Sequence, residues 1–142
     1  MGIMESDPSD ALYVVIRADQ DVVLARKRGR DLAARLGFSS VEQTLIATAI
    51  SEVARNIVSY AGEVEVTIAP VVDAHRQGIR VIARDSGPGI ADTDAAMRDG
   101  FSTGKSLGVG LPGARRLMDD FELASKINAG TAVTMTKWLQ RR

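Results

Sequence analysis

The chain has 142 residues, of which 45% are hydrophobic and 25% charged, and its 18 basic and 18 acidic residues cancel to a formal net charge of zero. This length predicts one domain with a sizeable core, and the balanced charge argues against a nucleic-acid partner held by bulk electrostatics. With no cysteine and one histidine, disulfides, thiol catalysis and multi-histidine metal sites are excluded. No apolar run approaches the roughly 20 residues that span a membrane, and the N-terminus lacks the pattern of a secretory signal. The cytoplasm is therefore the expected location.

The N-terminal part predicts one strand and one helix. Residues 1–10 are polar and without pattern, which indicates a flexible tail. The run 11–16 is apolar and rich in β-formers, which is typical of a strand. Asp19 and Asp21 can cap the helix that follows, and Gly37 suits its left-handed C-terminal end.

The second helix is the longest periodic segment. Ser40 and Gln43 form a capping-box pattern at its start, and the helix is expected over about 41–59. Its inner stripe consists of β-branched residues at helical spacing: Ile46, Ile50, Val53 and Ile57.

Two runs then alternate between apolar and polar residues. The runs 64–68 and 79–83 predict strands, joined through a connection over 70–78. The pattern disappears over 91–110, a polar and glycine-rich stretch. Connections of this length in a compact domain are usually functional or disordered.

The C-terminal part predicts one more helix and two more strands. Pro112 fits the first turn of the helix, and the strands are expected near 121–125 and 131–138. The element order is therefore β-α-α-β-β-loop-α-β-β. It predicts an α+β fold, a two-layer sandwich in which helices pack on one face of a mostly antiparallel sheet.

The glycines are concentrated around the patternless stretch. Gly87 and Gly89 stand on either side of a proline, and Gly108 and Gly110 lie just before the helix predicted near Pro112. Glycine lets a backbone approach a ligand closely, and the free N–H groups at a helix start favour an anion. An ordinary flexible loop is the alternative. Neither the Walker spacing nor a Rossmann fingerprint after a first strand is present.

Three polar residues are candidates for chemistry. Glu52 and Asn56 are four positions apart, so they project from one helix face beside the apolar stripe. Carboxylate and amide oxygens suit Mg²⁺, whereas a solvated helix face is the alternative. Asp85 ends a strand and opens the glycine turn. It either bonds its own turn or accepts an N–H group from a ligand.

The order and spacing of these motifs resemble the nucleotide-binding boxes of the GHKL ATPase superfamily, which includes gyrase, Hsp90, sensor histidine kinases and MutL. The matching motifs are Glu52-x-x-x-Asn56, Asp85-x-Gly87-x-Gly89 and Gly108-x-Gly110. The resemblance implies the Bergerat ATP-binding fold over 11–142. Further segments resemble the compact branch of anti-sigma-factor serine kinases, and above all the RsbT-type switch kinases of stressosomes: 48–57, 59–62, 99–103, 108–113, 116–119 and 137–139.

The resemblance also implies a role for each residue. Glu52 would be the general base for an incoming hydroxyl, or would order a metal-bound water, and Asn56 would bind ATP and ligate Mg²⁺. Asp85 would accept the adenine amino group, with Thr131 assisting near the base. The segment 91–107 would be the ATP lid. The other residues implied in ATP binding are Gly87, Gly89, Ser102, Thr103, Lys105, Gly108, Val109, Gly110 and Leu111.

The implied function is a protein serine/threonine kinase that uses ATP and Mg²⁺. STAS-domain proteins of a stressosome-like complex would be its substrates, and the released kinase would activate a PP2C-type phosphatase or another output protein. One alternative is an anti-sigma factor that sequesters a sigma factor and phosphorylates an anti-anti-sigma protein. Another is an ATP-gated interaction module without transfer, although such a module would need no base at Glu52.

Overall fold

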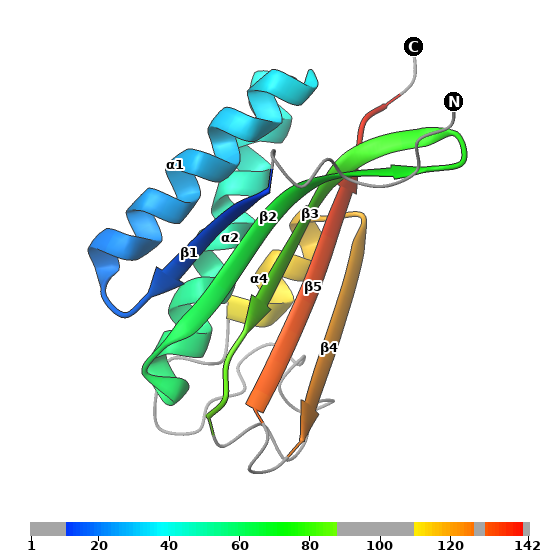
Figure 1. Ribbon diagram of the computed structural model, residues 1–142. Coiled ribbons are helices and arrows are strands. Elements are labelled where there is room, and N and C mark those ends of the chain that lie inside the picture. Colours follow the sequence, from blue (N-terminus) through cyan, green and yellow to red (C-terminus); the bar gives the residue numbers. More distant parts are fainter. Residues whose placement is uncertain (1–10, 88–109, 127–129, 141–142) are drawn as a thin grey trace.

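A sheet and a layer of helices make up the part of the chain that the computed structural model describes, residues 11–87, 110–126 and 130–140. Figure 1 shows the helices covering one face of the sheet. None of the helices in these ranges is long and apolar enough to cross a membrane. The elements follow the predicted order: β1 (Leu12–Ile16), α1 (Asp19–Leu36), α2 (Ser40–Ala61), β2 (Val64–Asp73), β3 (Arg76–Arg84), α4 (Gly110–Leu117), β4 (Asp120–Lys126) and β5 (Gly130–Trp138).

The five strands lie in the order β1-β2-β3-β5-β4, and every neighbouring pair is antiparallel. The predicted α+β class is confirmed. Strand β5 is inserted between β3 and β4, so that Arg84 at the end of β3 lies opposite Ala132 near the start of β5. This insertion brings two chain segments almost 50 positions apart to the same end of the sheet.

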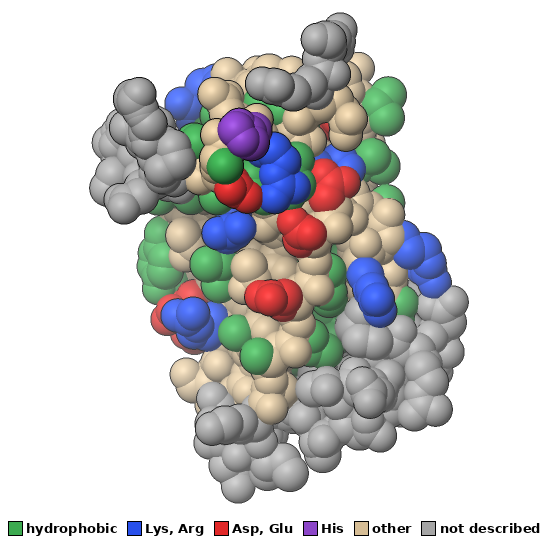
Figure 2. Space-filling view, turned by 90° about the vertical axis from the view of Figure 1, so that its right-hand side faces the viewer, with side chains coloured by type: hydrophobic (Ala, Val, Ile, Leu, Met, Phe, Trp, Pro, Cys, Tyr) green, Lys and Arg blue, Asp and Glu red, His purple; other side chains and the backbone are tan. Residues whose placement is uncertain are grey.

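The predicted connection over 70–78 is wrong. Strands β2 and β3 remain paired as far as Asp73 opposite Arg76, and only the two residues between them form the turn. Pro70 breaks the hydropathy pattern, but it lies beyond the part of β2 that pairs with β1. At Pro70, therefore, β2 has no strand on its β1 side and forms an edge of the sheet, where proline is tolerated. The turn exposes the single histidine, His75, which is purple in Figure 2.

The capping box of α2 lies one residue earlier than predicted. Ser39, and not Ser40, accepts from the backbone N–H of Glu42 at 3.1 Å, and Glu42 accepts from the N–H of Ser39 at 3.0 Å. Gln43 instead donates to the carbonyl of Phe38 at 2.9 Å. Two adjacent serines each have a suitable partner three positions on, so the local pattern fits both registers. Burial of Phe38 in the core accompanies the earlier start.

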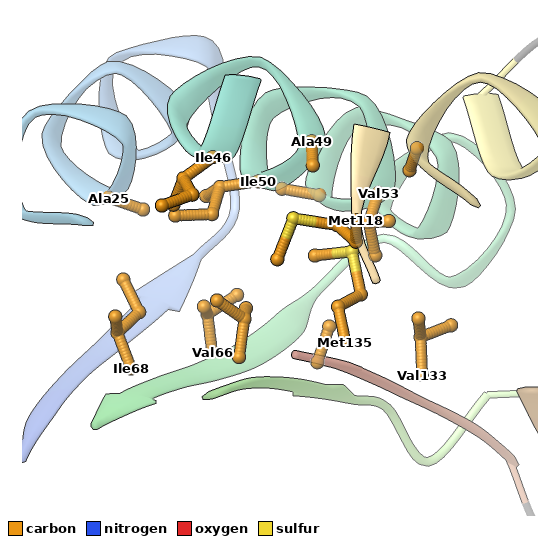
Figure 3. Packing of buried hydrophobic residues seen from close by; sticks show 14 of the residues in the cluster. Ala25, Ile46, Ala49, Ile50, Val53, Val66, Ile68, Met118, Val133 and Met135 are labelled. Carbon is orange, nitrogen blue, oxygen red and sulfur yellow. The ribbon is translucent and has the colours of Figure 1, made fainter. Parts of the chain in front are cut away.

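The core lies between the two layers. Figure 3 shows Ile46, Ile50 and Val53 of α2 above the sheet residues Val66 and Met135. The stripe predicted for α2 is confirmed, because its four members are at most 1% exposed. Burying these side chains contributes about 1.5–3 kcal/mol each. This packing fixes the rotation of α2, and therefore also fixes where its polar residues point.

Candidate functional site

The end of α2, the end of β3 and the start of β5 meet at one end of the sheet, the lower end in Figure 1. The N–H group of Asp85, directly after β3, donates to the carbonyl of Thr131 in β5 at 2.9 Å. Gly87 lies so close to Ala61, the last residue of α2, that an added Cβ would meet the Ala61 Cβ at 2.9 Å. The glycine turn is therefore enclosed between β5 and α2, and Gly87 permits the close approach.

Asp85 combines both alternatives that the sequence left open. Its side chain is 7% exposed. One carboxylate oxygen, Oδ1, accepts from the N–H of Gly87 at 2.6 Å and so bonds its own turn. The other, Oδ2, is buried and has no hydrogen-bond partner in the described part of the chain. A buried acceptor without a partner is costly, and an N–H group of a ligand would satisfy it.

The charge of Asp85 is held in an unfavourable environment. Burial raises the pKa of its carboxyl group, while the backbone N–H groups of Gly87 and Thr131 oppose this rise. Strongly buried titratable groups cluster at functional sites. Two hollows, of about 340 Å³ and 250 Å³, flank Asp85 at this end of the sheet. Glu52 and Asn56 line neither hollow.

The solvated helix face that was the alternative for Glu52 and Asn56 is not what α2 presents. Asn56 is 2% exposed, whereas Glu52 is half-buried. Arg55, between them in sequence, is exposed. Asn56 is therefore enclosed by the fold while Glu52 remains partly accessible, and an amide side chain is mostly exposed in folded proteins.

The donor set at α2 fits Mg²⁺ in the way this ion is usually bound. No group of three or more histidine, aspartate or glutamate side chains that could hold a metal lies within the described ranges. An ion at Asn56 would therefore take most of its ligands from water and phosphate oxygens. Mg²⁺ typically retains several waters and binds phosphates together with one or two protein oxygens.

Tyr60 belongs to the same site, although it was not identified from the sequence. Its hydroxyl is buried without a hydrogen-bond partner among the described residues. Burial raises the pKa of Tyr60 to about 12; the nearby Thr131 hydroxyl lowers it and the charge of Asp85 raises it further. A sequence signal for Tyr60 was its spacing, because Glu52, Asn56 and Tyr60 are each four positions apart and so lie along one side of the helix.

Thr131 is held in place by the neighbouring strand. It is 2% exposed, and its hydroxyl lies 2.9 Å from the hydroxyl of Ser125 in β4. Ser125 also donates to the carbonyl of Gly130 at 3.2 Å. Thr131 thus lies with Tyr60 and Asp85 in a group of interacting polar residues at this end of the sheet.

The remaining predicted residues divide into two groups. Gly110 begins α4, and the side chain of Leu111 is fully buried in the core, so that only its backbone is available to a ligand. The lid predicted over 91–107 lies outside the described residues. So do several of the residues expected to bind ATP: Gly89, Ser102, Thr103, Lys105, Gly108 and Val109.

Gly130 is expected to be essential for the position of Asp85. Its φ of 93° lies in the left-handed region, and an added Cβ would overlap the carbonyl oxygen of Asp85. We expect Gly130→Ala to lower the free energy of unfolding by about 2–4 kcal/mol, because backbone strain and overlap add. Gly62→Ala is the matched control, since its φ is 83° but nothing lies within 4 Å of the added Cβ. Gly62→Ala should lower the free energy of unfolding by only about 1 kcal/mol. Urea denaturation measures both variants. Equal losses in the two variants would contradict the proposed contact.

Comparison with known proteins identifies this arrangement. A family model described as the histidine kinase-like ATPase domain matches residues 16–137. The chain belongs to this family. The match covers every element that builds the site, from the end of β1 to β5. The resemblance to GHKL ATPases that the motifs predicted is therefore confirmed.

The chain is similar to a serine/threonine-protein kinase and to anti-sigma F factors. It is 48% identical over 132 residues to the serine/threonine-protein kinase RsbT of Bacillus subtilis (strain 168), which covers 93% of this chain and 99% of that protein. It is 33% identical over 128 residues to an anti-sigma F factor of Caldanaerobacter subterraneus subsp. tengcongensis, covering 86% and 88%. An anti-sigma F factor of Bacillus cereus is 30% identical over 125 residues, covering 84% and 86%. The predicted enzyme class, a protein serine/threonine kinase, is confirmed.

Proposed function

We propose that this domain binds ATP at the end of the sheet where Asp85 lies and transfers the γ-phosphate to a serine or threonine of a partner protein. The observation that carries the proposal is the buried carboxylate oxygen of Asp85, which has no partner among the described residues. Helix α2 supports it with Asn56, which is buried, and Glu52, which is half-buried. In this proposal Asp85 supplies an acceptor for the adenine amino group, Asn56 supplies an oxygen for a metal, and Glu52 supplies an oxygen that can accept a proton.

Each residue would perform one part of the reaction. Asp85 would accept the amino group of adenine, with Tyr60 and Thr131 beside the base. Asn56 would hold Mg²⁺, which when bound would neutralise charge on the phosphates. Glu52 would orient the incoming hydroxyl and accept its proton. Phosphoryl transfer depends mainly on positioning and charge neutralisation, so that this small set would be sufficient.

The rest of the phosphate site follows from the glycines before α4. The backbone N–H groups of Gly110 and Leu111 would face the phosphates, because the first N–H groups of a helix have no partner inside it. Those of Gly108 and Val109 would add to them. Gly87 and Gly89 would bring the turn against adenine. In the lid, Ser102, Thr103 and Lys105 would reach phosphate oxygens.

The substrates and partners extend the proposal. Similarity to RsbT over 93% of the chain supports a switch kinase that phosphorylates STAS-domain proteins of a stressosome-like complex. Release from that complex would let the kinase activate a PP2C-type phosphatase or another output protein. A cytoplasmic location belongs to the same proposal.

The direct test is transfer of radiolabelled γ-phosphate from ATP to a purified STAS-domain protein in the presence of Mg²⁺. We expect acid-stable label on serine or threonine, and its loss when the metal is chelated. A STAS-domain protein with its acceptor hydroxyl replaced by alanine is the control. Tight ATP binding without transfer to any STAS-domain protein would instead favour the ATP-gated interaction module.

The similarity to anti-sigma F factors supports a second candidate. In that case the domain would sequester a sigma factor, and phosphorylation of an anti-anti-sigma protein would release it. Affinity purification of the tagged chain separates the two functions. Recovery of an RNA polymerase sigma subunit without STAS-domain scaffold proteins would favour the anti-sigma factor.

A further inference from the structure

Helix α4 ends without the cap that the other two described helices use. Helices α1 and α2 end at Gly37 and Gly62, each in the left-handed conformation, with φ of 101° and 83°. After Leu117 the chain enters β4 within two residues, and neither is a glycine. The last carbonyl groups of a helix have no partner inside it. Those of α4 therefore need a donor from elsewhere in the fold.

Lys137 of β5 supplies that donor. Its Nζ donates to the carbonyl of Leu117 at 3.0 Å and lies 3.8 Å from the Asp119 carboxylate. Lys137 follows the buried residues Val133 and Met135 at two-residue spacing along β5, so it lies on the same face of the sheet as they do, the face that the helices cover. Its side chain is only 12% exposed. A lysine so enclosed is costly unless its ammonium group is paired, and here the helix end and a carboxylate pair it.

The short turn after α4 is fixed to β5 at further points. The N–H of Asp119 donates to the carbonyl of Thr136 at 2.9 Å. Its carboxylate oxygen Oδ2 accepts from the N–H of Trp138 at 2.7 Å. Lys137 lies between these two residues of β5. The C-terminal end of α4 is thus attached to an interior strand of the sheet by bonds on consecutive residues.

Because α4 is only eight residues long, or about 12 Å, its two ends move as one body. Leu111 in its first turn and Ala114 in its middle are both fully buried in the core. The attachment at Leu117 then fixes the direction of the axis and with it the position of the first turn at Gly110. The ammonium group also has the sign that a helix C-terminus favours.

We propose that Lys137 is a positioning residue for phosphate binding, acting through α4. The inference rests on the proposed function, because it assumes that the first turn of α4 faces the phosphates of ATP. Lys137 touches neither the nucleotide nor the acceptor in this account. It orients the helix whose N–H groups bind the phosphates, so its loss should affect phosphate recognition and leave recognition of adenine unchanged.

The test compares the affinities for ATP and for adenosine by calorimetry. In Lys137→Met the side chain keeps about the same length and its apolar stem but loses the donor. We expect ATP to bind about fivefold to tenfold more weakly, while adenosine binds as in the wild type. Lys137→Arg should restore most of the difference, because a guanidinium can donate to the same carbonyl group. Lys27→Met is the matched control, since the Lys27 side chain is 72% exposed.

The outcomes are distinguishable. If Lys137→Met weakens the binding of ATP and of adenosine by the same factor, Lys137 serves only stability. If it weakens the binding of neither, Lys137 has no role in the site. Either result overturns the inference. If Lys137→Met does not fold, Lys137→Gln, which retains a neutral donor, must show the same selective loss to a smaller degree. A wild-type protein that binds adenosine and ATP equally would overturn the role of α4 as well. One that binds neither would overturn the proposed function itself.

Discussion

Asp85→Asn is expected to lower the affinity for ATP by about 100-fold, the largest effect on binding in this chain. The substitution keeps the shape of the side chain, and the amide oxygen can still accept from the N–H of Gly87, as Oδ1 does at 2.6 Å. The buried position of Oδ2, however, would receive an NH₂ group that donates. A donor cannot accept the adenine amino group, and a charge-assisted hydrogen bond contributes about 1.5–3 kcal/mol. Calorimetric titration with ATP measures the loss.

The same variant should be more stable without nucleotide. The folded-state pKa of Asp85 is raised mainly by burial, so that folding disfavours the ionised form of this carboxyl group. The wild type should therefore gain free energy of unfolding as the pH falls through that raised pKa, and Asp85→Asn should lack this gain. At a pH above that raised pKa, where the wild-type carboxyl group carries its charge, the variant should melt at a higher temperature than the wild type. Sites that bind ligands often sacrifice stability in this way.

Asp31→Asn is the matched control for both measurements. Asp31 is an exposed aspartate on α1, where it pairs with Lys27. Its substitution should leave both the affinity for ATP and the pH dependence of stability unchanged. If Asp85→Asn bound ATP as tightly as this control, Asp85 would not be the adenine acceptor. Loss of binding together with a lower melting temperature would indicate instead that the turn around Gly87 had collapsed.

Glu52→Gln is expected to lower phosphoryl transfer by about 10²–10⁴-fold, the range that a positioned general base contributes. The amide has the same size as the carboxylate, so that the packing of this half-buried side chain on α2 should survive. It cannot accept a proton from the incoming hydroxyl. ATP affinity should change by no more than about twofold, because Asp85 and Asn56 remain. Single-turnover transfer of labelled phosphate to a STAS-domain protein, at saturating ATP, measures the chemical step.

Glu122→Gln provides the comparison for that experiment. Glu122 is exposed on β4, at the edge of the sheet, and this substitution should transfer phosphate at the wild-type rate. Equal rates for Glu52→Gln and the wild type would remove Glu52 from the role of base. If Glu52→Gln lost ATP affinity in parallel with transfer, Glu52 would act in binding, most simply by ordering a metal-bound water.

Much of the fold could be predicted from local patterns. The stripe of α2 and the alternation in β2 and β3 reflect which side chains leave water, and burial is nearly complete at each of those positions. The errors occurred where a local pattern fits two registers or where proline interrupts a pattern. Ser39 and Ser40 are equally good caps by sequence, and Pro70 is compatible with a strand only because that part of β2 lies at a sheet edge.

The candidate site was predicted in its motifs but not in its arrangement. The spacing of Glu52, Asn56 and Asp85 was sufficient to indicate an ATPase family. The spacing of four also includes Tyr60, but it did not mark this residue as part of a site, since a tyrosine on a helix is more often part of a core. It could not reveal Lys137 either, because its acceptor at Leu117 lies 20 positions away and belongs to another element.

By itself, then, the sequence determined the order of the elements and the family, and it supplied the residues of the proposed ATP site, because these depend on spacing along the chain. Only the tertiary structure decided that Asp85 keeps one oxygen for its turn and leaves the other buried without a partner among the described residues. The reason is that β5 inserts beside β3 and encloses the turn against α2. Burial and hydrogen-bond partners across such distances are set by packing, and no local pattern specifies them.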